Sequence, residues 1–370
     1  MRRRLGAGAL VLLGVLTACS AEVPGSSVTP TQSSASLSAS ATATVTSQQT
    51  PSSTPPAPVV PARPSVVSNT KPGAPGGTVG LVLANGVLWG LDDSGAGQPG
   101  YLLRATTAHP HLVRVAKIGT YASGLAVTND RVWVVNGSGD PRDHAYKDST
   151  IDEFDTSARL LREYKVPGAA SITARGHDAW VNIPQSAPPV TAGLGSTAID
   201  ALSAGRVRHL TNIAWTVAAQ APTIGLLPDG RLVTLTSGSG DTTSVWFLDP
   251  STGRHLATTT VELSGLASLA VRGNDVLVAV GSVTTGGVAD VTATTARVLP
   301  HCGNPDSVAA SVSSQWALST VAQGAVAVSR VTSAGCGPLL TLGGAGGTAQ
   351  IAADGPTAWI LSVASLTRVH

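Results

Sequence analysis

The sequence predicts an all-β protein, a seven-bladed β-propeller of four-stranded antiparallel blades that follows a signal peptide and a disordered linker. Three observations support this prediction. Short apolar runs recur seven times at near-regular spacing, polar turn residues separate them, and the composition favours turns. The 370 residues include 41 Gly and 24 Pro, whereas only 12% are charged and 4% are aromatic. Low charge with frequent turn formers is typical of β proteins with many tight turns.

The repeat is clearest from Gly124 to Val166, where GLAV, RVWVV, TIDEFD and LLREYKV have the pattern of four short strands separated by turns. One aromatic or large apolar residue marks the second strand of each unit, and these markers lie 39 to 53 residues apart, with a mean of 45. Such a period is expected for propeller blades. The seven markers are Trp89, Trp133, Trp180, Val233, Leu277, Trp316 and Trp359.

We expect the marker side chains to pack between neighbouring blades, where a large group fills the widening gap. A carbohydrate-stacking surface is the alternative. Trp215 and Trp246 lie outside the marker register and are therefore candidates for surface contacts.

The seventh unit supplies only three strands, the last of them near Leu366 to Val369. An unpaired sheet edge invites aggregation. We therefore expect residues 64–69 (PSVVSN) to return as the closing strand of a propeller that spans residues 76–370, and we expect deletion of this segment to destabilise the domain.

The N-terminal residues resemble the signal of a bacterial lipoprotein. Arg2, Arg3 and Arg4 form a positive region, and the apolar run from Leu5 to Leu16 is too short to span a bilayer. The sequence LTAC that ends at Cys19 resembles a lipobox, which implies a diacylglyceryl cysteine, a palmitate-type acyl group and removal of residues 1–18. The lipid would anchor the chain at the outer face of the cytoplasmic membrane or in the cell envelope. An ordinary secretory signal is the alternative.

Residues 19–75 carry the composition of a tether. From Ser20 to Ala62 the only charged residue is Glu22, and Ser, Thr, Ala and Pro dominate. Such a segment has too little apolar surface to offset the entropy of ordering, so we expect a disordered linker that gives the folded domain reach. O-glycosylation of this linker and a plain spacer both remain open.

The charge balance does not argue for nucleic acid as a partner, and we expect none. The formal net charge of +2 includes the three arginines of the signal, and without them 20 basic residues face 21 acidic ones. No basic stripe with interleaved aromatic residues is available for phosphate contacts. We expect a monomer.

Two cysteines remain after Cys19. Cys302 and Cys336 are 34 residues apart in the unit of the sixth blade. An exported protein meets an oxidising compartment, so we predict a disulfide that staples this blade. A metal-binding or reactive thiol pair is the alternative, but no His or Cys partners stand at ligand spacing.

Two sets of polar residues are candidates for a site at the mouth of the propeller. The connection into the sixth blade provides a candidate binding loop of His301, Asn304 and Asp306; a turn fixed by the disulfide and Pro305 is the alternative. Loops after the second strands carry carboxylates able to bind a hard ion such as Ca²⁺, although no spacing matches a known calcium loop. These candidate metal ligands are Asp92, Asp93, Asp140, Asp143 and Asp241. No other cofactor is predicted.

The repeating unit consists of an inner strand, the pattern xVWV, a polar loop, the pattern TIDxxD and a TGR-like turn. Over residues 76–370 this unit resembles that of the YncE-like and streptogramin-lyase-like bacterial propellers. Lyases of that kind use a His general base and a metal-ligating acid in the mouth, and this sequence places no such pair in matching context. We therefore expect a cell-envelope lipoprotein whose propeller is a non-catalytic binding or scaffolding module for an envelope protein, a glycan or a small molecule. A metal-dependent enzyme of lyase or lactonase type, acting at the central channel, is the alternative.

Overall fold

The computed structural model divides the chain into two units, residues 1–56 and Ala57–His370. All described residues belong to the second unit, and they contain no helix with the length and apolar character needed to cross a membrane. They comprise residues 64–70, 77–93, 98–137, 149–186, 195–215, 223–237, 242–263, 265–281, 286–321, 325–343, 349–362 and 365–370. The predicted signal, Cys19 and most of the predicted linker lie outside them.

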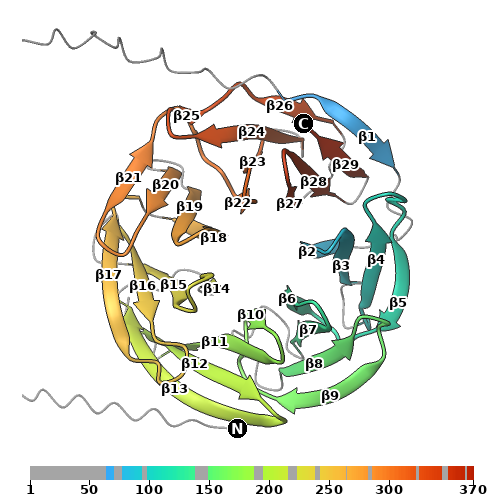
Figure 1. Cartoon of the computed structure of the whole chain (residues 1–370), viewed down its shortest axis with the longest axis vertical. Coiled ribbons are helices and arrows are strands. Elements are labelled where there is room, and N and C mark those ends of the chain that lie inside the picture. Colours follow the sequence, from blue (N-terminus) through green and yellow to red (C-terminus); the bar gives the residue numbers. More distant parts are fainter. Residues whose placement is uncertain are drawn as a thin grey trace, which may run out of the picture. The chain divides into compact units, whose positions relative to one another are not determined.

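Seven antiparallel sheets stand in a ring, each with its first strand innermost (Figure 1). Blade 1 contains β2 (Gly77–Ala84), β3 (Val87–Asp93), β4 (Tyr101–Thr106) and β5 (Val113–Lys117). Blade 2 contains β6 (Ala122–Val127), β7 (Arg131–Asn136), β8 (Thr150–Asp155) and β9 (Leu160–Lys165). Blade 3 contains β10 (Ser171–Arg175), β11 (Asp178–Ser186), β12 (Gly195–Ser203) and β13 (Arg206–Trp215).

The remaining blades follow the same order. Blade 4 contains β14 (Ile224–Leu226), β15 (Leu232–Ser237), β16 (Thr243–Leu248) and β17 (His255–Val261). Blade 5 contains β18 (Leu266–Arg272), β19 (Asp275–Gly281), β20 (Gly287–Val291) and β21 (Ala296–Leu299). Blade 6 contains β22 (Ser307–Ala310), β23 (Gln315–Thr320), β24 (Val326–Thr332), β25 (Gly335–Cys336) and β26 (Leu340–Leu342). Blade 7 contains β27 (Gln350–Asp354), β28 (Thr357–Leu361), β29 (Leu366–Val369) and β1 (Val66–Thr70). The predicted fold class, a seven-bladed propeller of four-stranded antiparallel blades, is confirmed.

Local sequence explains the tight turns within the blades. Asn85 and Gly86 join β2 to β3 with φ values of 51° and 72°, and Ala204 and Gly205 join β12 to β13 with 50° and 80°. Two consecutive positive φ values define the hairpin turn whose twist matches that of the strands, and Asn-Gly is its preferred sequence.

The marker residues form the joints between blades, as the sequence predicts. All seven side chains are buried, and each belongs to a separate apolar cluster that it shares with the next blade. Trp133 of blade 2, for example, lies in one cluster with Ile172 and Val181 of blade 3. Trp246, which is outside the register, is half-buried, and its indole N–H donates to Thr236 Oγ1 at 2.8 Å. The side chain of Trp215 is outside the described part of the chain.

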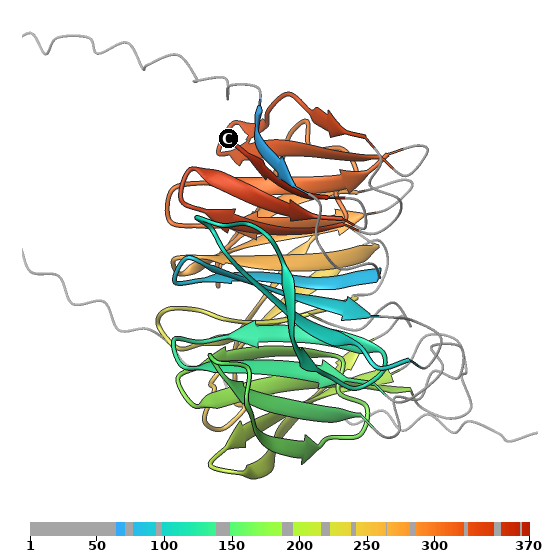
Figure 2. The same cartoon turned by 90° about the vertical axis from the view of Figure 1, so that its right-hand side faces the viewer.

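Strand β1 completes blade 7 from the other end of the unit, where the sequence places a closing strand. It runs antiparallel to β29, with Val66 opposite Val369 and Thr70 opposite Leu366. Beyond the strand, Ser65 and His370 exchange two backbone hydrogen bonds of 3.0 and 2.9 Å. In the view of Figure 1 and in the turned view of Figure 2, the blue β1 lies beside the dark red strands of blade 7.

The predicted disulfide between Cys302 and Cys336 is present, with a Cα–Cα distance of 4.8 Å. Cys302 lies in the connection from β21 to β22, and Cys336 ends β25, so the bond ties the entry of blade 6 to its outer edge. The outer edge of this blade is divided, because β25 and β26 pair with β24 separately. Pro338 lies between the two pieces and lacks the N–H that a continuous strand would donate.

Candidate functional site

The predicted calcium ligands lie largely outside the described residues. This holds for Asp140, Asp143 and Asp241 and for the side chain of Asp93. Asp92 is described: it is buried near the end of β3, and its Oδ2 accepts a hydrogen bond from Arg114 Nη2 at 2.9 Å. This ion pair joins β3 to β5 within blade 1. Within the described ranges, no group of three or more His, Cys, Asp and Glu side chains is arranged to hold a metal ion.

The three residues of the predicted binding loop lie in the connection between blades 5 and 6. The side chains of His301, Asn304 and Asp306 are all exposed there. His301 has a left-handed backbone with φ of 63°, beside the disulfide-bonded Cys302. Asp306 Oδ2 accepts a hydrogen bond from the backbone N–H of Thr320, which fastens the connection to the end of β23. All three residues therefore lie in one connection, and the hydrogen bond of Asp306 holds that connection against blade 6.

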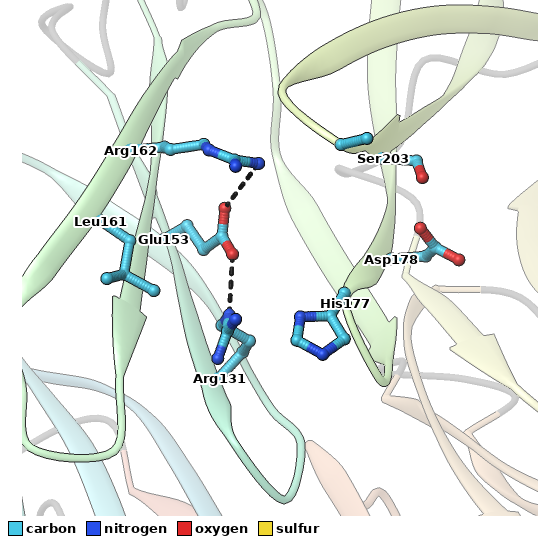
Figure 3. A pocket seen from close by; sticks show the side chains of 8 residues that line it. Arg131, Glu153, Leu161, Arg162, His177, Asp178 and Ser203 are labelled. Carbon is cyan, nitrogen blue, oxygen red and sulfur yellow. Dashed lines mark hydrogen bonds and ion pairs between the residues drawn. The ribbon is translucent and has the colours of Figure 1, made fainter.

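A pocket of about 470 Å³ opens between blades 2 and 3 (Figure 3). It was not predicted, because the expected ligands lie in the loops that follow the second strands. The pocket lies instead beside two turns of blade 3, one that joins its first strand to its second and one that joins its third strand to its fourth. Its lining comprises Arg131, Glu153, Leu161, Arg162, His177, Asp178, Ser203 and Ala204.

A buried carboxylate lies at the blade 2 wall of this pocket. Glu153 in β8 is opposite Trp133 in β7 and Arg162 in β9, so its side chain is on the sheet face that packs against blade 3. Its Oε1 accepts a hydrogen bond from Arg131 Nε at 2.9 Å, and its Oε2 accepts one from the Tyr164 hydroxyl at 3.0 Å. Both carboxylate oxygens therefore have partners, as a buried charge requires.

Two arginines flank Glu153 from opposite sides (Figure 3). Arg131 is well occupied, since its Nη1 also donates to the backbone O of Asp130 at 2.8 Å and lies 3.3 Å from Asp130 Oδ2. Arg162 Nη1 is 4.0 Å from Glu153 Oε2. A hydrogen bond with Tyr164 raises the pKa of Arg162, which keeps the guanidinium charged. Burial raises the pKa of Tyr164, so its hydroxyl stays protonated and donates to Glu153.

Blade 3 supplies the opposite wall through two turns. His177 precedes β11 and its Nε2 is 3.0 Å from Asp130 Oδ2, a contact that links the two blades. Asp178 and Ser203 lie across the pocket from the arginines (Figure 3). The pocket therefore has a cationic wall on blade 2 and an acidic and hydroxyl-bearing wall on blade 3. Such an arrangement can hold a polar ligand in a fixed orientation.

A second carboxylate in blade 2 has a shifted pKa but faces blade 1. Asp152 is buried in β8, and Asn136 Nδ2 donates to its Oδ2 at 2.8 Å. Burial raises the pKa of Asp152 to about 6, the hydrogen bond from Asn136 partly opposes this rise, and the charge of Glu163 adds to it. Since the unfolded-state pKa is about 3.9, the folded protein binds this proton more tightly, and stability falls as the pH rises from about 4 to 6 and is then constant.

We predict that Asp152→Asn abolishes this pH-dependent loss. At pH 7.5 the free energy of unfolding should rise by about 2–3 kcal/mol, the value that corresponds to the shift of the pKa; at pH 4 it should change little. Urea unfolding at both values measures the effect. Glu163→Gln removes only the charge of Glu163, which is a smaller cause of the raised pKa of Asp152 than burial. It should therefore raise the free energy of unfolding at pH 7.5 by a smaller amount. A loss of stability in Asp152→Asn at pH 7.5 would contradict the prediction.

The chain matches no protein-family model and no curated protein. Its fold matches solved structures. A chain of the hydrazine synthase of Kuenenia stuttgartiensis is 15% identical, with a TM-score of 0.58 over 80% of this chain and 95% of that one. A chain of a mitotic checkpoint complex is 12% identical, with a TM-score of 0.56 over 82% and 93%. A quinoprotein alcohol dehydrogenase-like protein of Bacteroides thetaiotaomicron is 11% identical, with a TM-score of 0.50 over 71% and 65%. At these identities the likeness shows the propeller fold alone.

Proposed function

We propose that this chain is an exported lipoprotein whose propeller is a non-catalytic binding module. The pocket between blades 2 and 3 carries the binding part of the proposal. Its volume is within the range of small-molecule sites, roughly 300–1,000 Å³, and Arg131 and Glu153 in its wall are held in place by hydrogen bonds before any ligand arrives. Both oxygens of Glu153 accept hydrogen bonds, from Arg131 and from Tyr164, so this carboxylate holds these two side chains in position.

Two observations support export to an oxidising compartment. The first is the resemblance of LTAC at Cys19 to a lipobox. The second is the disulfide between Cys302 and Cys336, because structural disulfides persist mainly in secreted and envelope proteins. Together they favour an anchor at the outer face of the cytoplasmic membrane or in the cell envelope, with residues 19–63 as the tether.

The preferred partner is a small molecule or a short segment of a larger one, such as an envelope protein or a glycan, because the pocket is too small for an extended surface. We propose that the protein acts as a monomer. The pairing of β1 with β29 supports this, since it leaves blade 7 with four strands and covers an edge to which a second chain would otherwise add.

Lipidation tests the anchor. In cells given alkyne-labelled palmitate, we expect the wild-type chain to carry the label, to fractionate with membranes and to begin at Cys19. Cys19→Ala should lose the label and leave the membrane fraction, because no thiol remains at the cleavage site. Ser20→Ala is the matched control and should behave as wild type. An unlabelled wild-type chain would overturn the lipoprotein assignment.

A further inference from the structure

We propose that the pocket between blades 2 and 3 binds a small zwitterion, namely an amino acid or short peptide with free ends. Its carboxylate would bind Arg162, and its ammonium group would bind Asp178. The inference names the ligand class for the proposed binding function and rests on it.

Arg162 is the cation available to a ligand. Its side chain is 52% exposed, and its ion pair with Glu153 is long, with 4.0 Å between Nη1 and Oε2. A guanidinium has five N–H donors in a planar fork that matches the two oxygens of a carboxylate. A Cβ atom at Gly205 would lie 3.6 Å from Arg162 Nη1, so the guanidinium is also held against the turn between β12 and β13. Arg131, by contrast, already uses its donors on Glu153 and Asp130.

Asp178 is the anion available to a ligand, and blade 5 shows why. Its counterpart there is Asp275, since each follows the first hairpin turn and is opposite an arginine. Asp275 forms an ion pair of 3.1 Å with that arginine, Arg272. In blade 3 the arginine is Arg175, and a Cβ atom at Gly230 of blade 4 would lie 3.4 Å from its Nη1. Arg175 therefore extends toward the next blade, and within the described part of the chain Asp178 forms no ion pair.

The two walls select a ligand with both charges. A simple anion on Arg162 would leave Asp178 without a cation, and a simple cation on Asp178 would leave Arg162 with only its 4.0 Å ion pair to Glu153. A zwitterion neutralises both at once, and charge-assisted hydrogen bonds of this kind are the strong ones. Leu161 and Ala204, which also line the pocket, offer apolar contacts for a small side chain.

Equilibrium dialysis of the detergent-solubilised full chain tests the inference. The probes are alanine, trialanine with free ends, N-acetyl-trialanine and trialanine amide, together with a neutral disaccharide and a dicarboxylate. We expect saturable binding of alanine, trialanine or both. Acetylation or amidation of trialanine should weaken its binding at least about tenfold, since each removes a charge-assisted hydrogen bond. Comparison of the affinities for alanine and trialanine shows whether the pocket prefers an amino acid or a peptide.

Matched variants locate the site. Arg162→Gln and Asp178→Asn should each weaken binding about tenfold or more. The controls are Arg297→Gln and Asp275→Asn. Arg297 matches Arg162 in its position: it is on the outer strand β21, opposite Asp290 of β20. Its Nη2 is 3.9 Å from Asp290 Oδ2, and 57% of its side chain is exposed. Both controls should bind as the wild type does, and melting temperatures of all four variants report whether the fold is intact.

Each outcome decides between the proposals. Binding of the disaccharide or dicarboxylate that Arg162→Gln abolishes would overturn the zwitterion and leave the binding module standing. Equal affinity for trialanine and its blocked forms, or equal losses in the control variants, would also overturn the zwitterion. Absence of binding by every probe would overturn the inference and remove the support that this pocket gives to the binding function, without bearing on the lipid anchor.

Discussion

Removal of β1 is expected to abolish the stable propeller, although the strand contributes only five residues. A chain that begins at Lys71 would leave β29 as an unpaired edge and lose the backbone pairing of residues 65–70 with the C-terminal strand. At about 1 kcal/mol for each hydrogen bond, the loss approaches the roughly 5–15 kcal/mol that holds a typical domain together. The buried side chains of Leu366 and Val369 would in addition lose cover.

The measurement compares chains that begin at Ala57, Pro64 and Lys71 by thermal unfolding and size-exclusion chromatography. The first two should melt together, and the third should be unfolded or aggregated, since an exposed edge strand recruits other chains. Val66→Ser is the point control. The Val66 side chain is 48% exposed, so this change should stay within about 0.5 kcal/mol. Cooperative melting of the Lys71 chain near the temperature of the Ala57 chain would refute this role of β1.

The blades could be predicted because their determinants are local and repeat. A strand pattern with turn residues at its ends needs only neighbouring residues to be recognised, and the spacing of markers such as Trp89 and Trp133 then fixes the period. The burial of these markers also follows from the repeat, since the same position in each second strand must meet the same neighbour. The closing strand was predictable from the incomplete seventh unit.

The pocket could not be predicted in this way, because it depends on contacts between blades. Glu153 and Asp178 face one cavity only because the outer part of blade 2 meets two turns of blade 3, and the sequence does not state which turns meet which strands. One signal was present. Glu153 is a charged residue between Ile151 and Phe154, at the level of a marker tryptophan on the neighbouring strand, and a buried acid in that position requires partners.

Strand length explains the different position of Asp92. The sequence suggested a loop carboxylate, free to bind an ion or to be solvated. The structure extends β3 to Asp93, so Asp92 belongs to the sheet, is buried and pairs with Arg114 of β5. The ends of strands are the least certain feature of a pattern-based prediction, and here two residues of extra strand, Asp92 and Asp93, give a carboxylate a partner within the sheet.

Loss of the disulfide is expected to lower the free energy of unfolding by about 3–4 kcal/mol, since the bond closes a loop over a sequence separation of 34 and restricts the unfolded chain. The bond also lies within the folded joint between blades 5 and 6, where buried Cys302 shares a cluster with Leu277 and Val308. Replacement of both cysteines by alanine therefore adds a packing loss to the entropic one, and the double variant should be at least as unstable as the reduced wild type.

Urea unfolding of the Cys19→Ala chain measures the effect, because Cys302 and Cys336 are then its only cysteines. Labelling with a maleimide before and after reduction shows how many thiols are free. The urea midpoint should fall on reduction, and a Cys302→Ala, Cys336→Ala chain should show no further change with reductant. An unchanged midpoint after verified reduction would mean that this bond adds little to stability. Binding at the pocket between blades 2 and 3 should survive reduction under native conditions, because neither cysteine contributes to the joint between those blades.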